Sequence, residues 1–495
     1  MKRGSGILLP VFSLPSDYGI GAFDEAAYHF IDQLAKMKQS YWQVLPLGPT
    51  GYGDSPYQSF STFAGNPYFI SLKELQRQKL LKEAECVICP SGKDYIDYEK
   101  LFQTRFRVLK KAFQRSKHQN TDEYKAFCEE NEFWLEDYAL YMAIKDVHGG
   151  KSMLTWEKEI LMRDSKSLGE YKERLQEEVD FYCYIQYEFY RQWDKLKAYA
   201  NKKGVKIIGD IPIYVAPDSA DVWANKELFQ LDENGYPTAV AGCPPDSFSA
   251  TGQLWGNPLY DWEYHKKTKY QWWVKRMQHC AKIYDVVRID HFRGFDEYYS
   301  IPYGEETAEN GSWKKGPGTD LFQQIKNDLG ELNIIAEDLG FITDTVQKLL
   351  EDTGFPGMKV LEFGFDSREE SDYLPHNYKS NSVVYTGTHD NSTVAGWLSE
   401  ISPEDKEYML NYIGEEDKNI GLEELIWKLI RLAMGSVSDL CIIPMQDYLG
   451  LDDKARINIP STIGGNWTWR MSEKAVTKET IQDVKKLTIL FGREN

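Results

Sequence analysis

The chain has 495 residues, 27% of them charged, with a formal net charge of −18. It is long enough to bury a large core, and its negative charge repels phosphate backbones and anionic membrane surfaces, so we expect neither nucleic acid nor a membrane as a partner. Aromatic residues make up 14% of the chain, and their flat faces suit a neutral ligand that stacks, although any single ring is explained equally well as core.

We expect no secretory signal at the N-terminus. Its apolar stretch ends at Leu9 and is followed by Pro10, without the long apolar region and cleavage site of a secretory signal. The seven cysteines are scattered, and their odd number is typical of reduced thiols. Cys86 and Cys89 form a C-x-x-C without a second pair or a histidine couple to complete a metal site. We therefore expect a cytoplasmic protein without a bound metal.

Eight short runs rich in Val, Ile, Leu and Tyr predict buried parallel strands. In chain order they are residues 6–12, 40–47, 205–211, 284–291, 332–337, 358–365, 382–388 and 439–445. Helical periodicity fills most of the gaps and predicts helices over residues 23–37, 272–284, 320–329 and 343–352. This alternation indicates an α/β fold, either a closed (β/α)8 TIM barrel or an open doubly wound sheet, and the number of strands does not decide between them.

Two segments are too long to be ordinary connections. Residues 49–204 are dense in Lys, Glu, Tyr and Phe at helical spacing, above all over 98–117 and 182–201, and predict a mostly helical subdomain inserted after the second strand. Residues 212–269 are rich in Gly, Pro, Asp, Asn and Trp and predict a long lid loop after the third strand. We expect residues 1–495 to form one catalytic barrel that carries both segments.

An acidic residue lies at or within two residues of the end of four apolar runs, and these residues are Asp210, Asp290, Glu337 and Asp390. In a parallel barrel the C-terminal ends of all strands converge on one face, whereas an open sheet binds its ligand at one switch point. Carboxylates at several strand ends therefore favour the barrel, and they predict an enzyme.

Each acidic strand end has a functional and a structural interpretation. Alternate residues of a strand share a face, so Arg288 can hold Asp290 ionised as a nucleophile, or the two form a structural ion pair. Burial would raise the pKa of Glu337 and suit it to donate a proton, unless it is a solvated helix cap. The His389–Asp390 step can reach a ligand at the strand terminus, although such a step is more often structural.

Several other kinds of site are not supported. The Gly51–Gly53 segment lacks the third glycine of a dinucleotide fingerprint, and the sequence contains neither a P-loop lysine pattern nor H-E-x-x-H. Asp232 and Asn234 lack the later acidic ligand of a calcium loop, so we interpret them as part of a turn. We expect no cofactor.

Taken together, the four acidic strand ends resemble those of the α-amylase superfamily of barrel enzymes. Within it, the chain is similar to the amylomaltases, 4-α-glucanotransferases that are also called disproportionating enzymes. The resemblance extends from SLPSDYGIG at residues 13–21 to GGNWTWR at residues 464–470. Its most particular marks are DSPYQ at residues 54–58 and SATGQLWGNP at residues 249–258.

The resemblance implies roles for individual residues. Asp290 would be the nucleophile, Glu337 the general acid and base, and Asp390 the carboxylate that steadies the distorted sugar. Ten further residues would contact substrate: Ser55, Tyr57, Asp210, Gln253, Trp255, Asn257, Arg288, Asp366, His389 and Asn458.

The implied reaction moves an α-1,4-glucan segment from a donor maltooligosaccharide to the 4-OH of an acceptor glucan or glucose, with retention through double displacement. Trp255, between Gly252 and Gly256, would close over the acceptor and limit the access of water. Two alternatives remain: a hydrolase of α-1,4-glucans with the same carboxylates, and a glucan-binding protein without activity, which predicts loss of at least one of them. The sequence carries no prediction of the oligomeric state.

Overall fold

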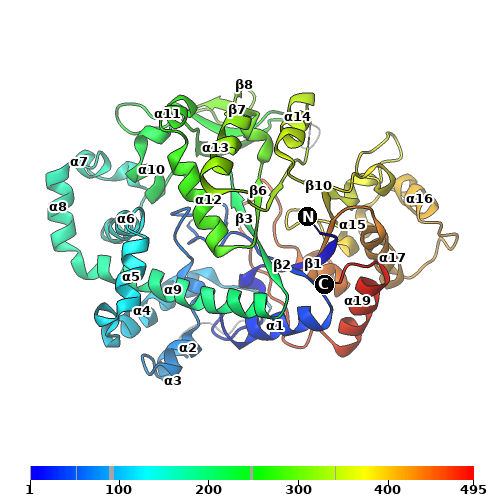
Figure 1. Ribbon diagram of the computed structural model, residues 1–495, viewed down its shortest axis with the longest axis horizontal. Helices are drawn as coiled ribbons and strands as arrows, with labels where there is room; N and C mark the ends of the chain where they lie inside the picture. The colour runs from blue at the N-terminus through cyan, green and yellow to red at the C-terminus, as the bar shows by residue number, and fades with distance from the viewer. Residues whose placement is uncertain (1, 52, 88–93, 246–248, 341, 495) are drawn as a thin grey trace.

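The computed structural model describes residues 2–51, 53–87, 94–245, 249–340 and 342–494 (Figure 1). Tyr52 of the glycine segment and Cys89 of the C-x-x-C lie outside the described residues. Eight parallel strands form one sheet in the order β10-β11-β12-β1-β2-β3-β6-β9. The backbone N–H of Ala336 beside β9 donates to the carbonyl of Pro356 beside β10 (3.0 Å), which joins the two ends of the sheet. The predicted TIM barrel is confirmed.

All eight predicted strands are present. Their bounds are β1 (Gly4–Leu8), β2 (Tyr41–Gln43), β3 (Lys206–Pro212), β6 (Val286–Asp290), β9 (Ile334–Ala336), β10 (Gly357–Val360), β11 (Ser382–Tyr385) and β12 (Leu440–Pro444). Every residue of β12 is buried, because core side chains and helices cover both faces of a parallel barrel strand. In β3, a Cβ atom at Gly209 would lie 2.2 Å from the ring of Tyr284, so only glycine lets the strand pack on that ring.

The predicted helices around the barrel are also present, and their ends follow capping chemistry. The helix α1 (Glu25–Lys36) begins after Asp24, whose side chain accepts from the backbone N–H of Ala26. The helix α14 (Asp344–Thr353) ends at Gly354 with φ 70°, a left-handed cap that glycine adopts without strain. The remaining helices after β3 are α10 (Ala220–Ala224), α11 (Trp262–Lys267), α12 (Gln271–Ile283), α13 (Thr319–Leu329), α15 (Val394–Glu400), α16 (Pro403–Tyr412), α17 (Leu422–Gly435), α18 (Met445–Tyr448) and α19 (Lys478–Leu490).

The described residues between β2 and β3 form eight α-helices. They are α2 (Leu72–Arg77), α3 (Glu83–Cys86), α4 (Tyr98–Arg115), α5 (Asp122–Glu130), α6 (Leu135–Val147), α7 (Lys158–Leu161), α8 (Ser165–Arg174) and α9 (Gln176–Lys202). The long helix α9 contacts α1 of the barrel as well as α4, α5, α6 and α8, so it links these helices to the barrel. In Figure 1 they gather on the side of the barrel opposite α15 to α17. Their delimitation as a subdomain over 49–204 stays a prediction.

The segment 212–269 contains more regular structure than a lid loop. Its strands β4 (Ala239–Cys243) and β5 (Gln253–Pro258) join β7 (Glu297–Pro302) and β8 (Ser312–Lys315) in a second, antiparallel sheet with the order β5-β4-β7-β8. The chain between β6 and β9 supplies half of this sheet. Local periodicity did not predict these strands, and β4 pairs with β7, which is distant in the sequence.

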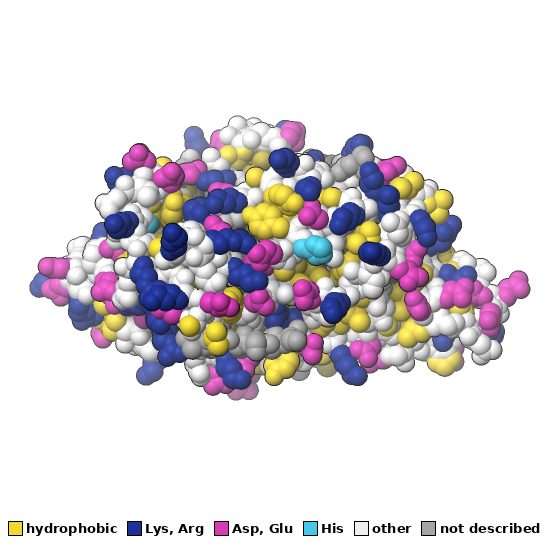
Figure 2. All heavy atoms as spheres, turned by 90° about the horizontal axis from the view of Figure 1, so that it is seen from below, with side chains coloured by type: hydrophobic (Ala, Val, Ile, Leu, Met, Phe, Trp, Pro, Cys, Tyr) yellow, Lys and Arg dark blue, Asp and Glu magenta, His cyan; other side chains and the backbone are white. Residues whose placement is uncertain are grey.

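Charged side chains of both signs are interspersed over the face shown in Figure 2. No single-sign patch dominates that face. Among the described residues, no helix has both the length and the apolar character needed to cross a bilayer.

Candidate active site

The parallel register of β3 and β6 brings Asp210, Arg288 and Asp290 together. Asp210 pairs with Arg288, and Pro212 pairs with Asp290. The Nη1 atom of Arg288 lies 2.7 Å from both carboxylate oxygens of Asp210 and 3.1 Å from Oδ1 of Asp290. Asp210 is fully buried and Arg288 is 3% exposed. Arg288 therefore bridges a buried carboxylate and a partly exposed one, and fixes the orientation of Asp290.

The pairing of β6 with β9 brings Glu337 beside Asp290. Ile289 of β6 pairs with Ala336 of β9, so Asp290 and Glu337 follow on neighbouring strands. Neighbouring strands lie about 4.8 Å apart. The two carboxylate oxygens of Glu337 accept from the backbone N–H groups of His291 and Leu339, both at 2.7 Å. These two hydrogen bonds hold the carboxyl group in place.

The backbone at His291 takes a left-handed conformation, with φ 53°. For a residue with a side chain this conformation is uncommon, and such residues cluster at functional sites. Here it ends β6 directly after Asp290 and accompanies the hydrogen bond from the N–H of His291 to Glu337.

Burial raises the pKa of both carboxyl groups on these neighbouring strands. The pKa of Asp290 rises to about 6 because burial outweighs the opposing charge of Arg288. The pKa of Glu337 rises to about 7, again chiefly through burial and then through the charge of Asp290. The side chain of Asp290 is 29% exposed, and Glu337 is 9% exposed. The more buried carboxyl group, that of Glu337, has the higher pKa.

Asp390 lies beyond the C-terminal end of β11 in a different environment. Burial by itself would raise its pKa, but His389 (3.3 Å between Nε2 and Oδ2) and the amide of Asn458 (2.6 Å to Oδ1) lower the pKa to about 2. The guanidinium of Arg456 donates to the backbone carbonyl of Asp390 (2.7 Å). Asp390 is therefore ionised at neutral pH and held from two sides.

An aromatic surface connects these groups. The ring of Tyr57 stacks on the imidazole of His389, with centroids 5.2 Å apart and planes at 15°. Its hydroxyl donates to Oδ2 of Asp210 (2.9 Å), and Trp467 lies 5.9 Å from its ring. The stacking therefore brings residues from both ends of the chain to the same carboxylates.

The second sheet reaches the site through β5. The indole of Trp255 donates to the side-chain carbonyl of Gln253 (3.1 Å) and meets the ring of His291 edge to face at 4.7 Å. The amide of Asn257 accepts from Gln58 (3.2 Å) and donates to the carbonyl of Val215 (2.7 Å). Trp255 thus stands next to the residue that contacts Glu337.

Two residues predicted to contact substrate have mainly local partners. Asp366 accepts from the backbone N–H, Nε and Nη2 of Arg368, and Ser55 accepts from the N–H of Tyr57. Sequence reasoning did not assign roles to Arg456, His291 or Trp467, although the last two stand inside conspicuous motifs. Within the described ranges no group of three or more His, Cys, Asp or Glu side chains is arranged to hold a metal ion.

An eight-stranded parallel barrel with paired carboxylates on neighbouring strand ends defines a class, the barrel enzymes that act on glycosidic bonds. The profile of the family described as 4-alpha-glucanotransferase matches residues 9–477. The chain therefore belongs to the 4-alpha-glucanotransferase family.

Similar proteins agree with this family. The chain is 49% identical to a 4-alpha-glucanotransferase of Streptococcus pneumoniae (strain ATCC BAA-334 / TIGR4), covering 100% of this chain and 98% of the relative. It is 48% identical to that of Clostridium butyricum, covering 98% and 99%. The solved amylomaltase of Streptococcus agalactiae in complex with acarbose has a TM-score of 0.96 at 43% identity, with 100% of both chains covered.

Proposed function

We propose that this protein transfers segments of α-1,4-glucan between maltooligosaccharides by a retaining double displacement. The observation that carries this proposal is that Asp290 and Glu337 directly follow the paired residues Ile289 of β6 and Ala336 of β9. Retaining enzymes need two carboxyl groups about 5–5.5 Å apart, close to the spacing of neighbouring strands. Membership of the 4-alpha-glucanotransferase family supports the choice of substrate.

The first displacement uses the two carboxyl groups in opposite protonation states. The carboxylate of Asp290, oriented by Arg288, attacks the anomeric carbon of the donor while the protonated Glu337 gives its proton to the departing 4-oxygen. The permanently ionised Asp390 stabilises the positive charge that develops on the sugar ring. The product is a glucan bound covalently to Asp290, and the shortened sugar leaves.

The second displacement reverses these roles. The 4-OH of an acceptor glucan loses its proton to Glu337 and attacks the anomeric carbon, which restores Asp290 and forms a new α-1,4 bond with retention. Water competes for the same intermediate. The ring of Trp255, beside His291 and Glu337, is positioned to stack on an acceptor sugar and to exclude water.

The remaining proposed contacts complete the donor side of the site. Tyr57 offers a stacking face, and Arg288 and His389 would donate to the same sugar, while the fully buried Asp210 would act on the donor side by holding Tyr57 and Arg288 in place. Ser55, Gln253, Asn257, Asp366 and Asn458 are proposed to contact sugars at neighbouring positions. A cytoplasmic location is part of the proposal, and the odd number and scattered spacing of the seven cysteines support it.

Incubation of the purified protein with maltotriose tests the activity. Transfer gives free glucose together with a ladder of longer maltooligosaccharides, which thin-layer chromatography resolves over time. Hydrolysis instead accumulates reducing ends without chain lengthening. A product pattern of glucose and maltose alone would replace the transferase by the α-1,4-glucan hydrolase.

The variant Trp255→Ala is expected to shift products from transfer toward hydrolysis. Removing the indole takes away the acceptor's stacking surface, worth about 1 kcal/mol or a fivefold change in the ratio of transfer to hydrolysis. The ratio is measured from maltotriose as longer products against total reducing ends. Trp313→Ala, which alters a more distant ring of the second sheet, serves as control. An unchanged ratio in Trp255→Ala contradicts the role of this ring.

The pH dependence of transfer is expected to be bell-shaped and centred between the two pKa values. Asp290 must be ionised, so kcat/KM falls as the pH drops below about 6. Glu337 must be protonated in the first displacement, so kcat/KM falls as the pH rises above about 7. Initial rates of glucose release from maltotriose between pH 4 and pH 9, in roughly half-unit steps, give both limbs. A profile that stays flat through this range contradicts the assignment.

A further inference from the structure

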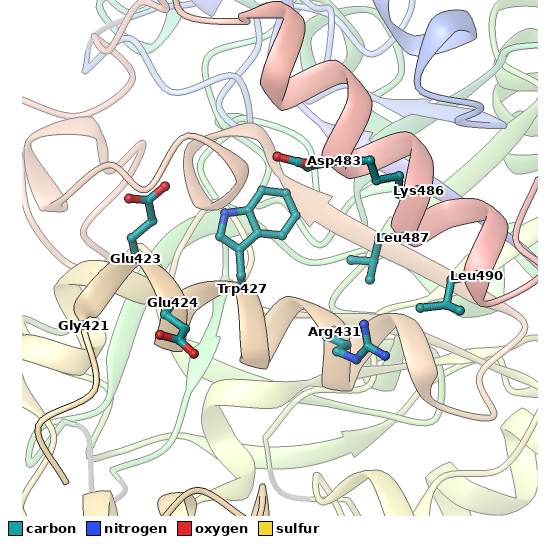
Figure 3. Close-up of a pocket in the computed structure, with 9 residues that line it drawn as sticks. All are labelled: Gly421, Glu423, Glu424, Trp427, Arg431, Asp483, Lys486, Leu487 and Leu490. Carbon is teal, nitrogen blue, oxygen red and sulfur yellow. Dashed lines mark hydrogen bonds and ion pairs between the residues drawn. The ribbon is translucent and has the colours of Figure 1, made fainter. Parts of the chain in front are cut away.

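A groove of about 680 Å³ lies between α17 and α19, on the outer wall of the barrel (Figure 3). Its volume falls within the range of about 300–1,000 Å³ that is typical of small-molecule sites. Figure 3 shows Trp427 projecting from α17 into the space between the helices, with Leu487 and Leu490 on α19 beside it. None of the groups described above for the active site lines this groove.

The ring of Trp427 packs against a neighbouring ring but remains partly exposed. One side of its indole packs against Tyr448, with centroids 5.8 Å apart and planes at 48°. The ring is only partly buried, and its indole N–H donates to no other described residue. Tryptophan N–H groups usually find a partner when the ring serves only as core. A partly exposed, fixed ring with an unused donor is the kind of platform on which a sugar stacks.

The rim of the groove carries both signs of charge. Glu423 and Glu424 lie in the first turn of α17, and Asp483 lies on α19, opposed by Arg431 and Lys486. Lys486 pairs with Asp483 (2.9 Å), and the Arg431 guanidinium lies 5.4 Å from the ring centroid of Phe491. Mixed charge recognises neither phosphate nor a cation strongly. Carboxylates and cationic donors around a flat ring instead match the hydroxyl groups and the apolar face of a neutral sugar.

The course of the two helices aims the groove toward the active-site end of the barrel. The helix α17 runs back along the barrel before β12 begins, so its first turn lies at the end where the strands terminate. The end of α19 lies at the opposite side, because Arg493 just beyond it donates to the carbonyl of Gly4 at the start of β1 (2.8 Å). The first turns of both helices, with Glu423 and Asp483 nearby, therefore lie toward the catalytic face.

We propose that this groove is a second glucan-binding site, which holds a distant part of a long α-1,4-glucan while its end reacts in the barrel. The inference rests on the proposed function for the identity of the sugar. Short substrates cannot span both sites, so the groove contributes only to long chains. Holding one part of a chain raises the effective concentration of the rest at the active site.

The test compares Trp427→Ala with the unaltered protein on long and short substrates. In native gels containing glycogen, the dissociation constant derived from retardation is expected to rise about fivefold, as follows from losing ~1 kcal/mol of aromatic contact. The KM for long-chain amylose is expected to rise by about the same factor, while kcat and KM for maltotriose stay within about twofold. Ile489→Ala, exposed on α19 but outside the groove, is the matched control and is expected to behave as the unaltered protein.

Several outcomes overturn the inference. Unchanged retardation of Trp427→Ala contradicts it, and so does an equal loss of retardation in Ile489→Ala. A changed oligomeric state of Trp427→Ala in size-exclusion chromatography would show instead that the groove is a contact between copies of the chain. If Trp427→Ala does not fold, the exposed pair Glu423→Ala and Glu424→Ala carries the same test, with about a threefold weaker interaction expected. The retardation in glycogen is independent of turnover, so a protein without transferase activity would fail the proposed function and still test the groove.

Discussion

The variant Asp290→Asn is expected to lose transfer from maltotriose by a factor of about 10⁴ or more, as removal of a catalytic nucleophile usually does. The amide keeps the shape of the side chain but cannot attack the anomeric carbon. Because this group is needed chiefly when the bond breaks, maltoheptaose binding by calorimetry should remain within about threefold of the unaltered protein. Glucose release and product lengthening are followed by chromatography.

The matched control makes the same chemical change elsewhere. Asp320→Asn on α13 removes an exposed carboxylate that pairs with Lys266, and turnover is expected to stay as in the unaltered protein. Retained disproportionation by Asp290→Asn would show that another group attacks the sugar. Loss of maltoheptaose binding together with activity would instead indicate that the Arg288 bridge fails when one carboxylate is neutral.

The barrel was predictable because its strands are short apolar runs whose chemistry is local. Burial on both faces requires Val, Ile and Leu in succession. Residues 205–211 and 439–445 can therefore be recognised as strands from their own sequence, without knowing which strands lie beside them. The strand ends were predicted less closely: the runs 40–47 and 358–365 extend several residues beyond β2 and β10, which end at Gln43 and Val360. The acidic residues after these runs could be assigned to one face of the molecule from parallel topology alone.

Contacts between distant segments were not predictable in this way. Asp210 pairs with Arg288 because β3 and β6 are neighbours in one register, and a shift of one strand by one residue would turn its side chain away from the other. The stacking of Tyr57 on His389 joins residues that no local pattern connects. The sheet of β4, β5, β7 and β8 is missing from the prediction, and its central pair, β4 and β7, joins segments on opposite sides of the barrel strand β6 in the sequence.

The electrostatics of Asp290 shows a further limit of sequence reasoning. The Arg288–Asp290 spacing predicted a carboxylate held ionised by its neighbour. In the structure the same guanidinium also contacts Asp210 at 2.7 Å, and burial raises the pKa of Asp290 to about 6. A sequence gives the sign of a neighbouring charge, but it does not give the degree of burial, which here has the larger effect on the pKa.

The variant Glu337→Gln is expected to lose transfer from maltotriose by a factor of about 10²–10⁴, the contribution of a positioned general acid. Glutamine keeps the size of the side chain, and its single carbonyl oxygen can accept from only one of the two N–H groups of His291 and Leu339. It cannot give a proton to the departing sugar. The alkaline limb near pH 7 should disappear from the residual activity, because the group that produces it is gone.

A donor that needs no proton separates this variant from Asp290→Asn. Fluoride leaves α-maltosyl fluoride without protonation, so Glu337→Gln should still form the covalent intermediate on Asp290, whereas Asp290→Asn should form none. Deglycosylation needs the missing base, and the intermediate should therefore accumulate and add the mass of a maltosyl group in intact-protein mass spectrometry. Glu331→Gln, exposed and paired with Lys326, is the control and should turn over both donors. If Glu337→Gln reacts with the fluoride no faster than Asp290→Asn does, Glu337 is not the proton donor. The roles of Asp290 as nucleophile and Glu337 as general acid would then have to be reassigned.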